Sequence, residues 1–290
     1  MTQRLLLTGA DGFTGRIFQA QAQACAAGHT VHALQADLTD PLAVASEVAE
    51  LQPTAVVHLA AISFVAHADE SAFEAVNVQG TQNLLEALAR LGVMPGCVLL
   101  ASSANVYGNC LNSPISERQP PAPVNHYARS KLEMETMARA YFDRLPIVIT
   151  RPFNYIGPGQ APQFLIPKLV DHFVRRAPRV ELGNLDVERE FNDVRWVCRS
   201  YLELLDKGLA GEIYNVCSGN AYALQTVIQT LTRMTGHTLQ VDVNPAFVRP
   251  NEVHRLCGDP SKLRACLGPL PNYTLEETLR SLMPSSPPLD

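Results

Sequence analysis

Two kinds of hydrophobic pattern alternate along the first half of the chain. Continuous apolar runs of about 4–8 residues are typical of buried strands, and longer stretches with apolar residues three or four apart are typical of helices. The predicted strands are Arg4–Thr8, 30–34, 55–59, 97–102 and 147–151. The predicted helices are 15–27, Pro41–Leu51, 77–91 and 127–141. This alternation predicts a doubly wound α/β fold, with helices on both faces of a parallel sheet.

The second half of the chain has a different pattern, with more predicted loops. Loops rich in Pro, Gly and Asn are expected at 154–162, 176–189 and 244–260, between helices at 167–176, Val194–Lys207 and Leu224–Thr235. Loops on a rigid scaffold often carry binding groups, so this half predicts a substrate-binding region. We expect a first domain over 1–153 with the chain returning to it around 190–218, a smaller lobe over 154–189 and 219–283, and a disordered tail over 284–290.

Composition narrows the classes of function. The net charge of the 290 residues is −5, and the longest basic cluster is Arg175-Arg176, so nucleic acid is not expected as a partner. No apolar run approaches the ~20 residues that span a bilayer, and Met1 leads into a strand rather than a signal peptide. The seven scattered cysteines lack metal-binding spacing, which predicts reduced thiols, no metal and a cytoplasmic protein.

A glycine-rich turn, Thr8-Gly-Ala-Asp-Gly-Phe-Thr-Gly15, joins the first strand to the first helix. Gly9 permits the tight turn, Gly12 lets the backbone approach a pyrophosphate, and Gly15 lets helix and strand pack closely. Free N–H groups at the start of the helix would bind the anion. The turn therefore predicts a Rossmann-type dinucleotide site. The residues expected to line it here are Gly9, Asp11, Gly12, Phe13, Thr14 and Gly15.

The end of the second strand bears on which dinucleotide is used. A site for NAD(H) usually offers Asp or Glu to the ribose 2′-hydroxyl, but this stretch reads His32-Ala-Leu-Gln35. With no carboxylate to repel a 2′-phosphate, NADP(H), or use of both cofactors, is favoured. Arg16 is a candidate partner for that phosphate or an ordinary surface arginine. Asp37, followed by Leu38, would accept a hydrogen bond from the adenine amino group, cap a turn, or do both.

A second motif carries catalytic chemistry. Tyr127-Ala-Arg-Ser-Lys131 places a phenol and an ammonium on one face of a helix. The ammonium would lower the pKa of Tyr127 so that it transfers a proton near neutral pH. Ser103, just after the predicted fourth strand, would donate a hydrogen bond to the same substrate oxygen. This set of groups suits the interconversion of an alcohol and a ketone beside a nicotinamide.

These motifs together resemble the extended short-chain dehydrogenases/reductases, a family of sugar-nucleotide epimerases, dehydratases and reductases. The matching segments stand in family order over nearly the whole chain: 8–15, 58–61, 77–81, 102–108, 127–131 and 151–154. The resemblance implies that Asn77 braces the central helix, that Lys131 also binds the nicotinamide ribose, and that Asn154 contacts a substrate phosphate. The further cofactor-lining residues that it implies are Leu38, Leu59, Ala60, Ala61, Asn77, Tyr127 and Lys131.

The segment after Ser103 separates the subfamilies. In the 4,6-dehydratases that this chain resembles, a Glu two residues after the catalytic Ser or Thr, often preceded by Asp, removes water; here Ala104 and Asn105 stand there. Neither side chain transfers a proton at pH 7, which argues against dehydration. GDP-fucose synthases place a Cys at the position of Asn105, so epimerisation by that route is disfavoured. Asn105 is retained as a substrate-binding candidate.

Downstream stretches at 182–191, 249–253 and 258–262 resemble GDP-mannose 4,6-dehydratases and GDP-4-keto-6-deoxy-D-mannose reductases. This resemblance implies that Arg189 and Arg249 pair with the diphosphate, that Glu252 binds the guanosine ribose and that Asn184 lies near the base. Guanidinium groups suit phosphate in kind, although surface ion pairs with Glu188 or Glu190 are the alternative for Arg189.

The sequence therefore predicts an NAD(P)H-dependent reductase that converts the 4-keto group of GDP-4-keto-6-deoxy-D-mannose to give GDP-D-rhamnose. The alternatives are a nucleotide-sugar 4-epimerase, a GDP-mannose 4,6-dehydratase that has recruited another acid, and a catalytically silent dinucleotide-binding regulator. The expected partner is a GDP-sugar, with no nucleic acid and no membrane. A homodimer is expected because it is usual in the family that the chain resembles.

Overall fold

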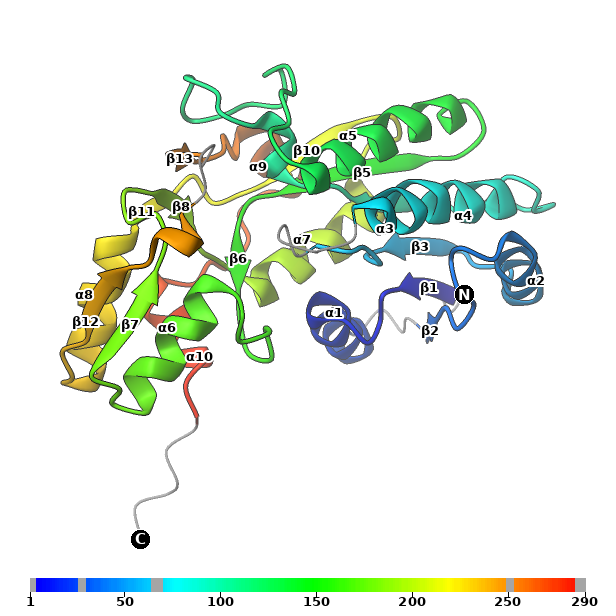
Figure 1. Ribbon diagram of the computed structural model, residues 1–290. Coiled ribbons are helices and arrows are strands. Elements are labelled where there is room, and N and C mark those ends of the chain that lie inside the picture. The colour runs from blue at the N-terminus through cyan, green and yellow to red at the C-terminus, as the bar shows by residue number, and fades with distance from the viewer. Residues whose placement is uncertain (1–3, 26–29, 64–69, 249–252, 285–290) are drawn as a thin grey trace, which may run out of the picture.

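The computed structural model describes residues 4–25, 30–63, 70–248 and 253–284. Its centre is a six-stranded parallel sheet with the order β10-β5-β4-β3-β1-β2 (Figure 1). The strands are β1 Arg4–Thr8, β2 Thr30–Ala33, β3 Ala55–His58, β4 Val98–Ala101, β5 Ile147–Pro152 and β10 Ile213–Val216. The order reverses direction between β1 and β3, which is where ligands bind in open α/β sheets. The predicted doubly wound class is confirmed.

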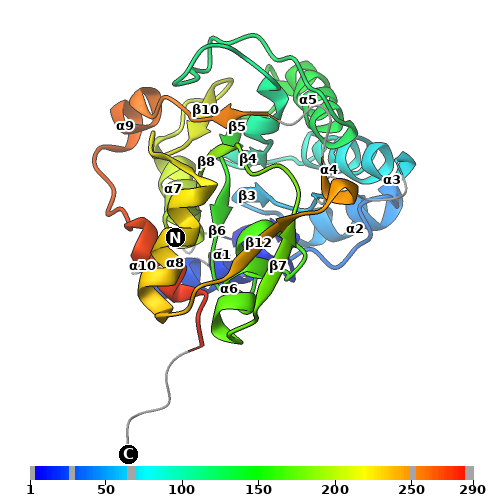
Figure 2. The same ribbon diagram turned by 60° about the vertical axis from the view of Figure 1, so that its left-hand side comes forward.

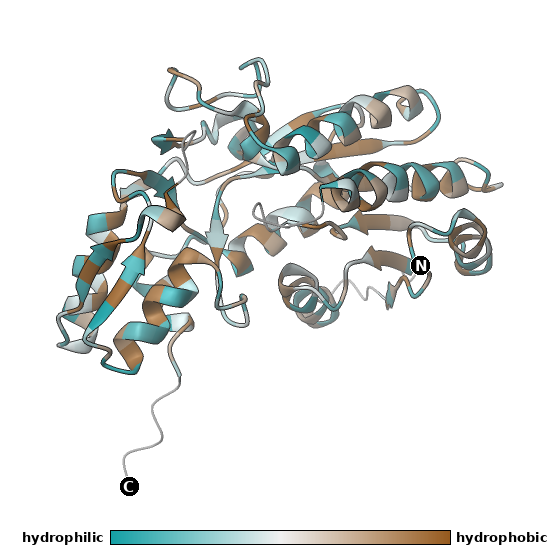
Figure 3. Ribbon diagram, viewed as in Figure 1, coloured by the Kyte–Doolittle hydropathy of each residue, from teal (hydrophilic) through white to brown (hydrophobic). Residues whose placement is uncertain are grey.

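Alternate residues of each central strand face opposite layers of helices. Leu5 and Leu7 pack with one layer, and Leu6 between them packs with the other, as the two-residue period of a strand requires. The first layer holds α1 Phe13–Ala24 and α7 Val194–Lys207. The second layer holds α2 Pro41–Leu51, α4 Gly80–Leu88 and α5 His126–Ala138. Figure 3 shows the central strands as brown, hydrophobic ribbon.

The helix predicted at 77–91 differs from a regular α-helix. It consists of α3 Ser71–Phe73, a π-helical stretch η1 Glu74–Gln79, and then α4. Such wide turns are frequent at functional sites. The helix predicted at 127–141 is α5 followed by a 3₁₀ turn, η3 Arg139–Tyr141.

A second body with its own apolar core is built from the later part of the chain (Figures 1 and 2). Its helices are α6 Leu165–Val174, α8 Leu224–Thr235 and α10 Leu275–Ser281. Its short strands are β7 Arg179–Leu182, β8 Glu188–Glu190, β11 Ala221–Ala223, β12 Gln240–Val243 and β13 Arg255–Leu256. The two-residue strands β6 Tyr155–Ile156 and β9 Asn192–Asp193 pair with each other.

The prediction of loops at 176–189 and 244–260 is therefore wrong in part, because the structure has the strands β7, β8 and β13 there. These strands are two to four residues long and rich in charge, so they carry little apolar pattern. The domain boundaries at 153, 190 and 218 stay predictions. Of the predicted tail, all but Pro284 lies outside the described residues. In the described ranges no helix is long and apolar enough to cross a bilayer.

Candidate active site

The glycine-rich turn forms a close-fitting cradle between β1 and α1. Gly9 has a φ of 69°, and a Cβ there would lie 2.7 Å from the Ala60 nitrogen. A Cβ on Gly15 would lie 2.1 Å from the Gly9 carbonyl oxygen, so only glycine fits. Helix α1 begins after Gly12, which provides no side-chain cap. The first N–H groups of α1 are therefore offered to an external acceptor, as an anion such as a pyrophosphate requires.

A buried chain of hydrogen bonds supports the cradle from below. Thr8 Oγ1 lies 2.7 Å from His58 Nδ1, and His58 Nε2 lies 2.8 Å from Thr81 Oγ1. Because the Thr81 hydroxyl donates to the Asn77 carbonyl, its oxygen accepts from His58 Nε2, and Nδ1 accepts from Thr8. Burial, with a contribution from Lys131, lowers the pKa of His58 to about 3. The neutral imidazole therefore connects the sheet to α4 and is a core residue.

Asn77 connects the segment after β3 to the catalytic helix. Its amide Nδ2 donates to the Ile62 carbonyl (3.1 Å) and to Ser130 Oγ (3.0 Å), and its Oδ1 accepts from the Ile62 nitrogen (2.9 Å). The side chain is fully buried. These three bonds fix the 59–62 segment against α5. The cofactor contacts of Leu59, Ala60 and Asn77 stay predictions.

The structure brings the three predicted catalytic residues together at the carboxyl end of β4. Ser103 follows β4 and caps the 3₁₀ turn η2 Ala104–Tyr107, while Tyr127 and Lys131 lie one helical turn apart on α5. All three are buried. A hydrogen bond from Ser103 reaches the Tyr127 hydroxyl and lowers its pKa. Lys131 Nζ donates to the Ala101 carbonyl at 2.7 Å, which holds the ammonium at the same strand end.

The expected direction of the Tyr127 pKa is wrong. Burial raises the pKa of Tyr127 above its ordinary value, and the hydrogen bond from Ser103 only partly offsets this. The contribution expected from Lys131 does not outweigh the removal of the phenol from water. Burial also lowers the pKa of Lys131 to about 8, against the opposing effect of Glu135. Tyr127 is therefore a protonated phenol at neutral pH, the form that donates a proton.

The titration of Lys131 predicts how activity depends on pH. Above a pH of about 8 the ammonium beside Tyr127 is lost, so we expect kcat/KM for ketone reduction to fall there with a slope of one proton. The Lys131→Arg variant should lack this fall because its guanidinium stays charged. A wild-type profile that is flat to pH 10 would contradict the assignment. Between pH 8 and 10.5 Lys131 is protonated in the unfolded chain but not in the folded protein. The contribution of Lys131 to the free energy of unfolding therefore rises with pH over this range.

Asn105 sets the direction of the Ser103 hydroxyl. Its backbone nitrogen and its Nδ2 both lie 3.2 Å from Ser103 Oγ and donate to it. With its oxygen accepting these two bonds, Ser103 is left to donate its own proton, which is the role expected of it. Ala104 is buried and apolar. Within the described ranges, no cluster of His, Cys, Asp and Glu side chains could hold a metal ion.

The residues after β2 form the adenosine end of the predicted cofactor site. Asp37 accepts from the Thr39 nitrogen (2.9 Å) and hydroxyl (2.8 Å), and these bonds lower its pKa. Asp40, not Asp37, caps α2. Leu38 is buried, and a Cβ at Gly80 would lie 2.9 Å from its Cβ. The turn role of Asp37 is therefore present, while its contact with adenine stays a prediction.

Sequence reasoning missed one carboxylate at this end of the site. Glu47, on α2, accepts hydrogen bonds from the backbone nitrogens of Gln35 (2.9 Å) and Ala36 (2.7 Å), directly after β2. The expectation that no carboxylate lies there is wrong, because the group arrives from a helix rather than from the strand. Arg16, the suggested partner of a 2′-phosphate, donates instead to the carbonyls of Asp11 and Gly159.

Tyr155 is a second residue that the sequence did not assign. Its hydroxyl lies 2.9 Å from Thr14 Oγ1, and its ring stacks on Phe13 with centroids 6.0 Å apart. Gly157, just beyond, permits a close approach, since a Cβ there would lie 2.3 Å from a Val194 methyl carbon. Tyr155 thus holds the loop after β5 against the start of α1. The sequence indicated the segment 151–154 and a loop over 154–162, but it did not indicate this contact.

The predicted substrate residues lie in several segments. Asn154 is exposed between β5 and β6, and Asn184 follows β7. Arg189 is buried in β8, where its guanidinium donates to the carbonyls of Glu188, Val253 and His254. Arg249 and Glu252 lie outside the described residues.

The acidic neighbours of Arg189 have other partners. Glu188 forms an ion pair with Arg255. Glu190 is fully buried and accepts hydrogen bonds from the Gly258 nitrogen (2.7 Å) and from the nitrogen (2.7 Å) and hydroxyl of Ser218. Burial raises its pKa while these bonds oppose the shift. Glu190 is therefore a structural centre that joins β8 to the segments around 218 and 258.

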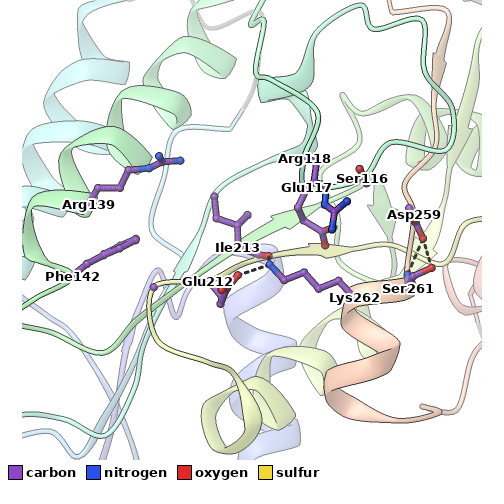
Figure 4. Close-up of a pocket in the computed structure, with 11 residues that line it drawn as sticks. Ser116, Glu117, Arg118, Arg139, Phe142, Glu212, Ile213, Asp259, Ser261 and Lys262 are labelled. Atoms are coloured by element: carbon purple, nitrogen blue, oxygen red, sulfur yellow. Dashed lines mark hydrogen bonds and ion pairs between the residues drawn. The ribbon is translucent and has the colours of Figure 1, made fainter.

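A cavity of about 740 Å³ lies apart from these residues, beside β10 (Figure 4). None of the predicted site residues that the structure describes lines it. Its charged lining residues are Glu117, Arg118, Arg139, Glu212, Asp259 and Lys262. Lys262 Nζ lies 2.7 Å from Glu212, and Asp259 accepts from Ser261 (Figure 4). The lining carries three cationic side chains and three carboxylates. It therefore has no net positive charge that would attract an anionic sugar nucleotide.

Comparison with known proteins agrees with this geometry. A family model described as GDP-mannose 4,6 dehydratase matches residues 6–282. The chain is 37% identical to a GDP-6-deoxy-D-talose 4-dehydrogenase from Aggregatibacter actinomycetemcomitans, over 91% of each chain. It is also 37% identical to a GDP-6-deoxy-D-mannose reductase from Pseudomonas aeruginosa, over 98% of this chain and 97% of the relative.

A solved structure, RMD from Pseudomonas aeruginosa complexed with NADPH, superposes with a TM-score of 0.89 at 35% identity, over 97% of both chains. Residues 6–282, which the family model matches, include the glycine cradle, Ser103, Tyr127 and Lys131. The chain therefore belongs to the GDP-mannose 4,6-dehydratase family of extended short-chain dehydrogenases/reductases.

Proposed function

We propose that this protein uses NADPH or NADH to reduce the 4-keto group of GDP-4-keto-6-deoxy-D-mannose and so forms GDP-D-rhamnose. The observation that carries the proposal is the meeting of Ser103, Tyr127 and Lys131 at the end of β4, with Asn105 where a dehydratase needs an acid. The full-length likeness to a GDP-6-deoxy-D-mannose reductase supports the same activity.

The glycine cradle and the N-terminus of α1 would hold the dinucleotide, because Gly9 and Gly15 leave no room for a Cβ and no side chain caps the helix. When bound, the reduced cofactor supplies the hydride that goes to C4 of the sugar. Ser103 donates a hydrogen bond to the O4 oxygen, and Tyr127 gives it the proton that completes the alcohol. Lys131 supplies positive charge beside the phenolate that remains.

Substrate binding is assigned to the segments beyond β5. Asn154 and Asn184 are expected to contact a phosphate and the base, and Asn105 presents its amide beside Ser103. Arg189 is expected to pair with the diphosphate, together with Arg249, while Glu252 binds the guanosine ribose. The carbonyls that hold the Arg189 guanidinium belong partly to Val253 and His254.

A second product is favoured by a specific observation. The relative named GDP-6-deoxy-D-talose 4-dehydrogenase is as similar to this chain as the mannose reductase. 6-Deoxy-D-talose and D-rhamnose differ only in configuration at C4, so the same ketone gives one or the other according to the face that receives hydride. The catalytic residues serve both outcomes.

One assay tests the function and its alternatives. The purified full chain is incubated with GDP-4-keto-6-deoxy-D-mannose and either NADPH or NADH, while the absorbance of the reduced nicotinamide is followed and the sugar is identified by NMR. Large H4 couplings indicate GDP-D-rhamnose and small ones the talose product. An epimerase would consume no cofactor, and a dehydratase would give a 4-keto product from GDP-mannose without a reductant. If neither cofactor is oxidised, the proposal fails.

We further propose a cytoplasmic homodimer. All seven cysteines are free, and burial raises the pKa of Cys97 to about 12, as suits a thiol kept reduced. Analytical ultracentrifugation at micromolar concentration would separate dimer from monomer. A single monomeric species would exclude the dimer.

A further inference from the structure

The end of β2 presents two consecutive backbone N–H groups to one carboxylate. β2 lies beside β1, and the Leu34 nitrogen continues the pairing by donating to the Leu7 carbonyl at 2.9 Å. The next two nitrogens leave the sheet. The Gln35 nitrogen lies 2.9 and 3.1 Å from the two carboxylate oxygens of Glu47, and the Ala36 nitrogen lies 2.7 Å from one of them.

The end of β2 lies next to the glycine-rich turn that follows β1. β1 runs directly into Gly9, and β2 is its neighbour, so residues 35 and 36 stand at the carboxyl edge beside the cradle. In a Rossmann site the adenosine ribose lies at the end of this second strand. Two neighbouring backbone N–H groups that point at one acceptor bind an anion, so a 2′-phosphate would compete for these two donors. Glu47 already occupies both donors with its own negative charge.

The one cationic group that the sequence suggested for a 2′-phosphate is directed elsewhere. Arg16 donates to the carbonyls of Asp11 and Gly159. The Gln35 side chain is uncharged, and its Nε2 donates back to the Ala33 carbonyl at 3.0 Å. A 2′-phosphate at this strand end would therefore meet a carboxylate on the N–H groups it needs, whereas a ribose 2′-hydroxyl would find an acceptor.

We infer that Glu47 determines cofactor specificity in this chain by holding a carboxylate on the Gln35 and Ala36 N–H groups, which favours NAD(H) over NADP(H). The inference rests on the proposed dinucleotide-dependent function and names the part of it that the strand sequence alone left open. Glu47 would act on the adenosine end of the cofactor, remote from Ser103 and Tyr127, so its effect belongs to binding rather than to the chemical step.

Calorimetric titration of the full chain with NAD⁺ and NADP⁺, in the absence of sugar, tests this. The wild-type chain should bind NAD⁺ more tightly. In Glu47→Gln, an amide oxygen still accepts an N–H bond but the charge is gone, so NADP⁺ should bind about tenfold more tightly while NAD⁺ changes less than about threefold. The matched control is Glu50→Gln, which removes the same charge from an exposed position on α2 and should leave the ratio of the two affinities unchanged.

The possible results distinguish a failure of the Glu47 inference from a failure of the proposed function. If the wild-type chain binds NADP⁺ more tightly than NAD⁺, or if the two glutamine variants shift the ratio equally, Glu47 does not set the preference and the reductase function is unaffected. If neither dinucleotide binds, the proposed function fails as well. A thermal melt of each variant shows whether it has folded, and a wild-type preference for NADP⁺ overturns the inference even if Glu47→Gln does not fold.

Discussion

Replacing Tyr127 by Phe should lower kcat for reduction of the keto sugar by about 10²–10⁴-fold, the usual contribution of a positioned proton donor. The phenol is buried at the end of β4, where Ser103 donates to it, and its raised pKa keeps its proton available at neutral pH. Phenylalanine fills the same space without the hydroxyl. Affinity for the dinucleotide should change by less than about threefold, because the cradle of Gly9 and Gly15 is untouched.

The measurement is a steady-state assay of cofactor oxidation with titration of the dinucleotide alongside. Tyr141→Phe is the matched control, since it removes a phenol from the short turn that follows the same helix, 3.5 Å from Glu86. That variant should retain the wild-type rate. An unchanged kcat in Tyr127→Phe would show that another group delivers the proton and would remove the main support for the catalytic assignment.

The sequence was informative wherever a feature is local. The strands β1, β3, β4 and β5 are largely buried, so they appear as continuous apolar runs, and Leu5, Leu6 and Leu7 have no exposed surface at all. β10 was not predicted as a strand because Asn215 interrupts its apolar pattern. That amide is fully buried and accepts from the Tyr107 hydroxyl at 2.7 Å, a partner 108 residues away in the chain.

In the candidate site, too, the sequence predicted local motifs and missed contacts between segments that are far apart in the chain. Local motifs and their order along the chain predicted Gly9, Gly15, Tyr127 and Lys131, because each motif lies within one turn or one helix. Glu47 was missed since its carboxylate reaches the end of β2 from a separate helix. The direction of the Tyr127 pKa was wrong because burial, which depends on the packing of several elements, outweighs a neighbour that the spacing reveals.

A buried ion pair behind the catalytic helix is another feature that only the fold brings together. Glu135 lies one turn after Lys131 on α5, and its carboxylate accepts from Arg151 Nε (2.9 Å) and Nη2 (2.6 Å). Ser102, next to Ser103, donates to the same carboxylate at 2.6 Å. The Arg151 guanidinium lies 4.8 Å from the centre of the Tyr107 ring. Both charges are almost completely removed from water.

Arg151→Met should therefore lower the free energy of unfolding by about 3–5 kcal/mol, because it leaves the Glu135 carboxylate buried without its partner. Glu135→Leu should cost a similar amount, and the double variant should be more stable than either single variant because no buried charge remains. Urea unfolding measures all three. The matched control is Arg175→Met, which breaks an exposed pair with Asp171 of similar length and should cost no more than about 1 kcal/mol.

The pair should also be detectable in catalysis. Because the charge of Glu135 raises the pKa of Lys131, Glu135→Gln should move the fall in kcat/KM from about pH 8 to a lower pH. A purely structural pair would change stability and leave that pH unchanged. If the double variant loses as much stability as the two single variants combined and the pH profile does not move, then Glu135 and Arg151 act independently, and the charge beside Lys131 has no part in setting its protonation.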